Sequence, residues 1–70
     1  MGDPMQLTVN GQPTTVEDGT TLPELLSSLG LQVGSVVVEH NGTALLRSEV
    51  ASAVLSDGDV LELVKAVAGG

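Results

Sequence analysis

Apolar and polar residues alternate at the start of the chain and again near its end, a period typical of half-buried β-strands. In residues 5–9, MQLTV, every second position is apolar. This run leads into Asn10-Gly11, a dipeptide that favours a tight hairpin turn, and a short second strand, PTTV, follows it. The pattern therefore predicts that a β-hairpin opens the fold.

The next segment, TTLPELLSSLG, has the spacing of one short amphipathic helix. Its leucines recur at helical intervals and form one apolar stripe: Leu22, Leu25, Leu26 and Leu29. Thr21 and Glu24 have the spacing of a capping box, which stabilises a helix start, and Gly30 is a typical C-terminal stop. We expect this helix to be stabilised by packing on a sheet, because two or three turns alone are marginal.

A second hairpin is predicted over SVVVEHNGTALLR, with its turn at Asn41-Gly42. Glu39 marks the solvent face, which places Val37 outward and Val36 and Val38 inward. The segment SEVASAVLS that follows is ambiguous between loop and a short turn of helix.

A turn at Asp57-Gly58-Asp59 leads into the last strand, VLELVKAV. Glu62 again marks the solvent side of this strand. Leu61 and Leu63 therefore point inward, and Val60 and Val64 point outward.

This order of elements predicts an α+β fold of the β-grasp, or ubiquitin-like, type. A mixed sheet of about four to five strands carries one main helix on one face, and the last strand pairs beside the first in the middle of the sheet. Residues 5–67 are expected to form this domain. Residues 1–4 resemble a remnant ahead of a natural start at Met5, and residues 68–70 are expected to form a flexible Ala-Gly-Gly tail.

Composition narrows the possible functions. The 70 residues include no Phe, Tyr, Trp or Cys, so the core must be aliphatic and neither disulfides nor thiolate metal sites are expected. A net charge of −7 argues against nucleic acid binding. The sequence has no apolar run that could span a bilayer and no signal peptide, so we expect a cytoplasmic protein without membrane contact.

The residue constellations that usually carry catalysis or bind metal are missing. His40 has no clear serine or carboxylate partner by spacing and is expected to be an ordinary residue at a strand end. Asp57 and Asp59 flank a glycine and are expected to form a turn that caps the strand start. We therefore expect neither an enzyme nor a bound metal or cofactor. The outward Val37, Val60 and Val64 are a possible partner patch if they are adjacent.

The C-terminal sequence AVAGG is the strongest functional candidate, because side-chain bulk decreases towards its end. The α-carboxylate of Gly70 is ionised at neutral pH and must be activated before it reacts, for example as an acyl-adenylate made from ATP. Gly69 and Ala68 would let the tail thread into a narrow enzyme channel, which side chains would obstruct.

The chain resembles the ThiS family of ubiquitin-like sulfur carriers in thiamine thiazole biosynthesis. The resemblance extends from Met5 to Gly70 and rests on MQLTVNGQ, TTLPELLSSLG, VVVEHNGTALLRSEV and LSDGDVLELVKAVAGG. Two positions depart from the family pattern, which often has an aromatic residue where Val50 stands and a proline where Leu46 stands. These departures affect packing more than function.

The resemblance implies that an ATP-dependent, E1-like enzyme adenylates the Gly70 carboxylate. A sulfur donor, ultimately a cysteine persulfide, would then leave a thiocarboxylate on Gly70, which delivers sulfur to thiazole synthase. The free protein is expected to be a monomer.

Two alternatives remain open. One keeps the same tail chemistry on another pathway, as the small subunit of molybdopterin synthase or as a cysteine-forming carrier. The other is a non-covalent ubiquitin-like binding module, or a modifier conjugated to lysines.

Overall fold

The chain opens with the hairpin that the alternation predicts. In the computed structural model, which describes residues 2–66, β1 (Met5–Val9) pairs antiparallel with β2 (Gln12–Val16). Asn10 and Gly11 form the turn, with φ angles of 50° and 79°. This left-handed region is the one that tight hairpin turns require and that Asn and Gly tolerate best.

The predicted helix is α1 (Leu22–Ser28), and its predicted capping box is confirmed. The Glu24 N–H donates to Thr21 Oγ1 at 3.3 Å, and the Thr21 N–H donates to Glu24 Oε1 at 2.9 Å. Leu29 was expected to complete the buried leucine stripe, but this expectation is wrong. The helix ends one residue earlier, so Leu29 leaves the stripe and is 48% exposed.

The second hairpin also forms, but its second strand is shorter than predicted. A 3₁₀ turn, η1 (Val33–Ser35), leads into β3 (Val36–His40), which pairs with the two-residue β4 (Thr43–Ala44). The chain then begins α2 (Arg47–Ser52), which resolves the ambiguous segment as helix.

A local hydrogen bond explains why the strand gives way to helix at this point. The carboxylate of Glu49, in the first turn of α2, accepts the Leu46 N–H at 2.7 Å. This bond satisfies a backbone donor that would be unpaired at a helix start.

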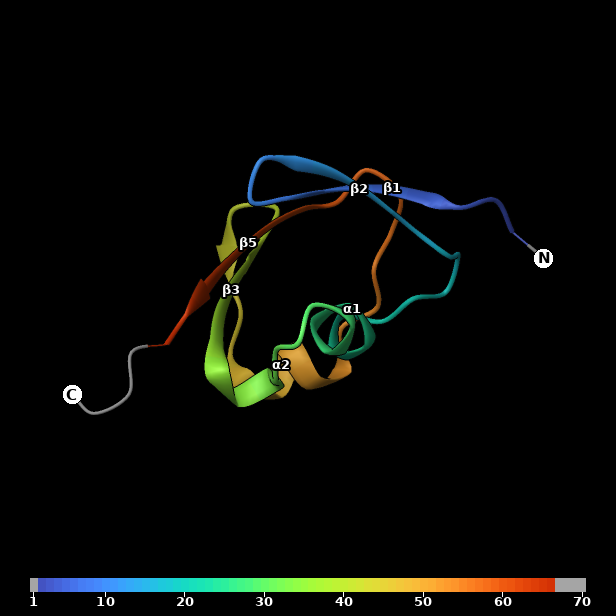
Figure 1. The fold of residues 1–70 in the computed structure, drawn as a ribbon. Coiled ribbons are helices and arrows are strands. Elements are labelled where there is room, and N and C mark those ends of the chain that lie inside the picture. Colours follow the sequence, from blue (N-terminus) through green and yellow to red (C-terminus); the bar gives the residue numbers. More distant parts are fainter. Residues whose placement is uncertain (1, 67–70) are drawn as a thin grey trace.

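The last strand, β5 (Val60–Lys65), lies in the middle of the sheet, whose strand order is β2-β1-β5-β3-β4. It runs parallel to β1 and antiparallel to β3. Figure 1 shows α1 and α2 on the same side of this sheet. The β-grasp prediction is therefore confirmed, with five strands and one main helix.

The core lies between the sheet and the two helices and is entirely aliphatic. Both inward-facing leucines predicted on β5 are buried, as are the inward valines of β3. Five side chains are almost completely buried: Leu22, Leu26, Val38, Val50 and Leu61. Within residues 2–66, neither helix has the length and hydrophobicity needed to cross a membrane.

Candidate functional site: the base of the C-terminal tail

β5 is the last element that the structure describes before the predicted functional tail. Hydrogen bonds from β1 hold the start of this strand: the Thr8 N–H donates to the Asp59 carbonyl and the Asn10 N–H to the Leu61 carbonyl, both at 2.9 Å. On the other side, β3 pairs with β5 along its whole length, from His40↔Leu61 to Val36↔Lys65. The strand is therefore fixed from both sides where it begins.

The side chain of Asn10 continues the pairing where the main chain of β1 has already turned away. Its Oδ1 accepts the Leu63 N–H at 2.7 Å, and its Nδ2 donates to the Leu63 carbonyl at 3.2 Å. One amide side chain thus replaces a whole strand residue, satisfying a donor and an acceptor that the sheet would otherwise leave unpaired. Asn10 therefore fixes the second half of β5.

Asn41, in the other hairpin turn, pairs with the beginning of β5 through its main-chain N–H and its side-chain oxygen. Its N–H donates to the Val60 carbonyl at 2.8 Å, and its Oδ1 accepts the Val60 N–H at 2.8 Å. Its φ of 51° shows the same left-handed conformation as Asn10. The two Asn-Gly turns thus hold the same strand from opposite sides, Asn41 at its first residue and Asn10 at Leu63 in its second half.

Asp59 organises the turn before β5. It is 7% exposed, and its carboxylate accepts the Ser56 N–H at 2.8 Å and Asn41 Nδ2 at 3.1 Å. His40 Nε2 lies 2.9 Å from the same carboxylate. The expectation that His40 has no carboxylate partner is therefore wrong: β3 and β5 bring together two residues whose separation in the sequence gives no hint of contact.

These contacts decide the ionisation of Asp59. Burial raises the pKa of this carboxyl, but the hydrogen bonds from Ser56, His40 and Asn41 and the charge of His40 lower it. The net result is a pKa below the usual value, so Asp59 is a carboxylate at neutral pH. As predicted, it caps the start of the strand.

The neighbouring Asp57 secures the same turn to β1. Its Oδ1 accepts the Gln6 N–H at 2.7 Å, and the Gly58 N–H donates to the Gln6 carbonyl at 2.7 Å. The predicted turn at residues 57–59 is thus confirmed. Among the residues that the structure describes, no group of three or more His, Cys, Asp or Glu side chains is arranged to hold a metal ion.

At the other end of β5, the Ala66 N–H donates to the Ser35 carbonyl at 2.8 Å. This is the last bond in the described part of the chain. The predicted tail residues Ala68, Gly69 and Gly70 lie outside the described residues, so the structure defines the base of the tail and not the tail itself.

Two of the three outward valines lie side by side. Val37 and Val64 face each other across β3 and β5 and are 51% and 60% exposed. Val60 is also exposed, but the pair Glu39↔Glu62 lies between it and the other two in the strand register. The outward face therefore carries an apolar pair next to the base of the tail and a separate valine further along.

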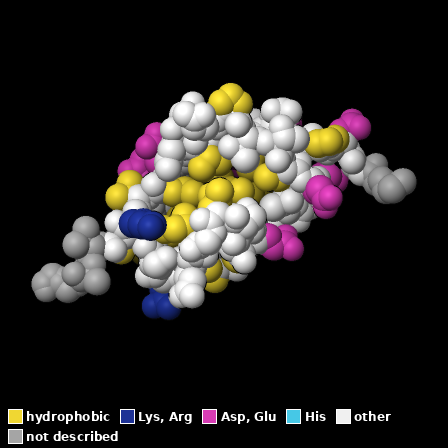
Figure 2. All heavy atoms as spheres, viewed as in Figure 1, with side chains coloured by type: hydrophobic (Ala, Val, Ile, Leu, Met, Phe, Trp, Pro, Cys, Tyr) yellow, Lys and Arg dark blue, Asp and Glu magenta, His cyan; other side chains and the backbone are white. Residues whose placement is uncertain are grey.

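An apolar hollow of about 380 Å³ adjoins the base of the tail on the opposite face of the sheet. Figure 2 shows apolar side chains in this hollow, between the sheet and the helices. Its lining comes from β1, β2, β3, β5 and the segment after α1: Val9, Asn10, Gln12, Thr14, Leu29, Leu31, Val36, Leu63 and Lys65. The exposed position of Leu29 is explained here, since its side chain forms part of this wall.

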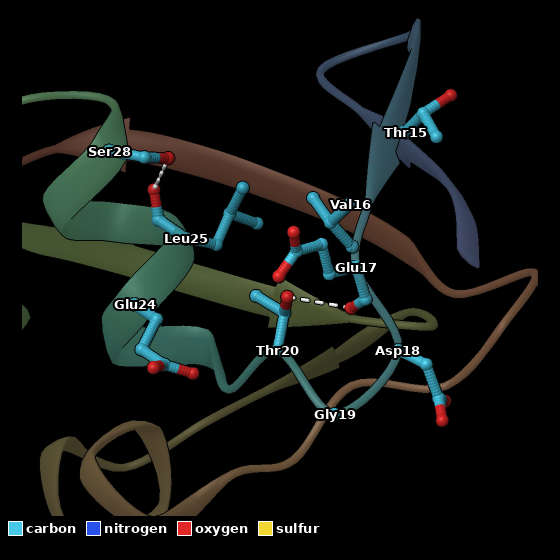
Figure 3. A pocket seen from close by; sticks show the side chains of 9 residues that line it. All are labelled: Thr15, Val16, Glu17, Asp18, Gly19, Thr20, Glu24, Leu25 and Ser28. Carbon is cyan, nitrogen blue, oxygen red and sulfur yellow. Dashed lines mark hydrogen bonds between the residues drawn. The ribbon is translucent and has the colours of Figure 1, made fainter. Parts of the chain in front are cut away.

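A second hollow, of about 470 Å³, lies between the end of β2 and α1 (Figure 3). Its polar groups serve local structure: Thr20 Oγ1 donates to the Glu17 carbonyl and Ser28 Oγ to the Leu25 carbonyl, both at 2.7 Å. Glu24 is engaged in the helix cap, where hydrogen bonds from the Thr21 backbone and hydroxyl lower its pKa. This hollow is formed by elements other than β5.

The comparisons with known proteins agree with one another. The sequence matches the ThiS family over residues 2–70. It is 42% identical over 62 residues to the sulfur carrier protein ThiS of Thermus thermophilus, a match that covers 89% of this chain and 95% of that protein.

The chain is also 38% identical over 66 residues to a thiazole synthase of Magnetococcus marinus and 35% identical over 66 residues to one of Paramagnetospirillum magneticum. Each match covers 94% of this chain, which spans only about 20% of the length of either synthase.

Solved structures support the same relationship. The crystal structure of a thiamine biosynthesis protein (ThiS) from Geobacter metallireducens superposes with a TM-score of 0.77 at 40% identity, covering 94% of this chain and all of that one. A solution structure of a thiamine biosynthesis protein from the same organism gives 0.74 at 40% identity, over 94% of this chain and 88% of that one. In sequence and in fold, this chain belongs to the ThiS family.

Proposed function

We propose that this chain is a sulfur carrier of thiamine biosynthesis, a protein that other enzymes act on and that is not itself an enzyme. The observation that carries the proposal is its match to a sulfur carrier protein over almost the whole of both chains. The proposal places the chemistry on the α-carboxylate of Gly70, which follows the small residues Ala68 and Gly69.

The first step is activation of the carboxylate. An ionised carboxylate is a poor electrophile. An E1-like enzyme transfers the adenylyl group of ATP to the Gly70 carboxylate, which forms an acyl-adenylate and releases pyrophosphate. The chain binds no cofactor for this step, since ATP belongs to the activating enzyme.

The second step introduces sulfur. The terminal sulfur of a persulfide attacks the Gly70 carbonyl carbon and AMP leaves, which gives an acyl persulfide. A thiol then breaks the sulfur–sulfur bond, so that a thiocarboxylate remains on Gly70 and the thiol is oxidised to a disulfide. Thiazole synthase accepts the sulfur from this thiocarboxylate.

The base of the tail suits this role. A tail that must enter an enzyme channel gains from a rigid origin, because a fixed base reduces the freedom that is lost on binding. β5 provides such an origin: β1 and β3 flank it, and Asn10 and Asn41 hold its backbone through their side chains. Gly69 and Ala68 would then thread towards the reacting centre without bulky side chains.

The exposed valines of β5 and β3 are the proposed docking patch for the activating enzyme. Val37 and Val64 form its centre, since they are adjacent across the sheet and mostly exposed, and Val60 extends it beyond Glu62. An apolar contact at this place would bring a partner next to the last residues of β5.

Intact-mass spectrometry tests the proposal directly. The chain is incubated with ATP, a sulfide or persulfide source and the cognate activating enzyme, with a Gly70-deleted chain as control. We expect a mass gain that corresponds to exchange of one oxygen for sulfur, and no gain in the control. Addition of thiazole synthase should reverse the gain, and prior alkylation of the thiocarboxylate should prevent this reversal.

The absence of any mass gain with an enzyme that adenylates another carrier would refute the proposal. An isopeptide bond between Gly70 and another protein would instead support the conjugated modifier. Sulfur transfer to a molybdopterin precursor, with none to thiazole synthase, would support the molybdopterin alternative.

A further inference from the structure

The chain has only two Lys or Arg residues against nine Asp and Glu residues, and they are Arg47 and Lys65. One lies at the start of α2 and the other at the end of β5, far apart in the sequence. Figure 2 shows both dark-blue side chains at the same end of the molecule, where β5 ends. Both strongly basic side chains of the protein are therefore located beside the base of the tail.

A single short segment, Gly34–Val36, connects the two basic residues. The Arg47 guanidinium lies directly over Gly34: a Cβ on residue 34 would be only 2.7 Å from Arg47 Nη2. The next residue, Ser35, accepts the Ala66 N–H, and Val36 faces Lys65 in the register of β3 and β5. The segment thus contacts Arg47 on one side and the end of β5 on the other.

Neither basic side chain is paired within the described protein. Within residues 2–66 the ion pair at salt-bridge distance is His40–Asp59, which involves neither Arg47 nor Lys65. Both basic residues are exposed. In a protein with a net charge of −7, two unpaired cations at one place form a local positive site on an otherwise acidic molecule.

We propose that Arg47 and Lys65, the cation pair, bind carboxylates that line the mouth of the channel in which the activating enzyme receives the tail. This inference rests on the proposed function and adds the chemistry of the contact. An acidic mouth would attract this end of the carrier and repel its acidic remainder. The cation pair therefore orients the carrier so that the tail leads.

The length of the tail argues against the phosphate of the adenylate as the anion that the cation pair binds. Gly70 is five residues beyond Lys65, and an extended chain of five residues spans about 17 Å. The phosphate of an acyl-adenylate on Gly70 would then be beyond the reach of the four-methylene side chain of Lys65. With an extended tail, the anions within reach of the cation pair are those of the surface through which the tail enters, and the anionic side chains of a protein are carboxylates.

The experiment measures adenylation of the tail by the cognate enzyme and, separately, binding of the two proteins by calorimetry without ATP. The test variant is Arg47→Gln with Lys65→Gln, which lowers the net charge by two. The matched control is Thr15→Glu with Ser27→Glu, which changes the net charge equally at exposed positions of β2 and α1. Melting curves verify that each variant folds.

We expect the test variant to raise KM and Kd by about 2- to 30-fold, since each exposed ion pair contributes about 0.2–1 kcal/mol. The value of kcat should not change, and the dependence of binding on salt should weaken. The control should change KM and Kd by less than about twofold. Equal effects in the test and control variants would refute the role of the cation pair.

Gly34→Ala provides an independent test of positioning. Its new Cβ displaces the Arg47 guanidinium but leaves the charge in place, so it should give part of the effect of Arg47→Gln without changing net charge. Binding identical to the wild type would contradict the arrangement.

The two assays separate this inference from the proposed function. Binding that depends on the cation pair, with no adenylation of any variant, would refute the carrier function and leave a docking surface. Adenylation of all variants with equal KM would support the carrier function and refute the cation pair.

Discussion

Replacing Asn10 with glycine tests whether a side chain holds the base of the tail. Glycine keeps the left-handed turn conformation, so the change removes the amide group without straining the backbone. Two hydrogen bonds to Leu63 are lost, one to its N–H and one to its carbonyl. The native backbone of β5 should then open more readily at this point than at Val60.

The magnitude follows from those two bonds. Each contributes about 0.5–1.5 kcal/mol net, so the free energy of unfolding should fall by about 1–3 kcal/mol. The entropy that glycine adds to the unfolded chain and the relief of a left-handed non-glycine residue are each about 1 kcal/mol and act in opposite directions. For a domain of this size, Tm should fall by about 5–20 °C.

Circular dichroism in urea gives the stability, because the chain has no aromatic residue for fluorescence. Amide hydrogen exchange measured by NMR shows where along β5 the backbone opens. The Leu63 amide should exchange faster in Asn10→Gly, while the Val60 amide, which Asn41 holds, serves as an internal control. A stability loss below about 0.5 kcal/mol, or equal acceleration at Leu63 and Val60, would refute the reasoning.

Three further predictions concern the helix cap, the buried carboxylate and the apolar pair. Thr21→Ala removes both bonds of its side chain to Glu24 and should lower the free energy of unfolding by about 0.5–2 kcal/mol in urea titrations, whereas an unchanged midpoint would contradict the role of the cap. The pKa of Asp59 is lowered in the folded state, so its charge stabilises the protein above its unfolded value of 3.8, and that stability is lost as pH falls through the folded value. Asp59→Asn should therefore melt with less dependence on pH below about 5 than the wild type, and parallel curves of Tm against pH would contradict this. Val64→Asp should weaken binding of the activating enzyme by at least about tenfold with little change in Tm, because the side chain is exposed on the proposed docking patch; unchanged affinity would remove the patch from the interface.

Much of the local structure could be predicted from the sequence, because it depends on interactions between residues a few positions apart. The Thr21–Glu24 cap spans three residues, and each Asn-Gly turn needs only a dipeptide with access to positive φ. Strand alternation assigned the inward residues of β3 and β5 correctly. Where the pattern was weak, as around Arg47, the predicted strand was wrong and a helix begins.

The charge and composition also had consequences that needed no coordinates. An acidic chain without aromatic residues or Cys must have an aliphatic core, and the structure has one. The motifs of the ThiS family were recognisable along the chain, and the family assignment is confirmed.

The contacts that define the base of the tail could not be predicted in this way. The sequence marked Asn10 and Asn41 as turn residues, but their side chains pair with β5, which lies beside them only after the last strand has inserted between β1 and β3. His40 gained its carboxylate partner by the same insertion.

The cation pair has the same origin. Arg47 and Lys65 are located together because η1 contacts α2 through Gly34 and the end of β5 through Ser35. The sequence by itself determined most of the elements, the two final glycines and the family, since these are local or compositional properties. Only the tertiary structure decided which distant side chains surround the base of the tail, because that depends on the long-range pairing of a central strand formed by the last part of the domain.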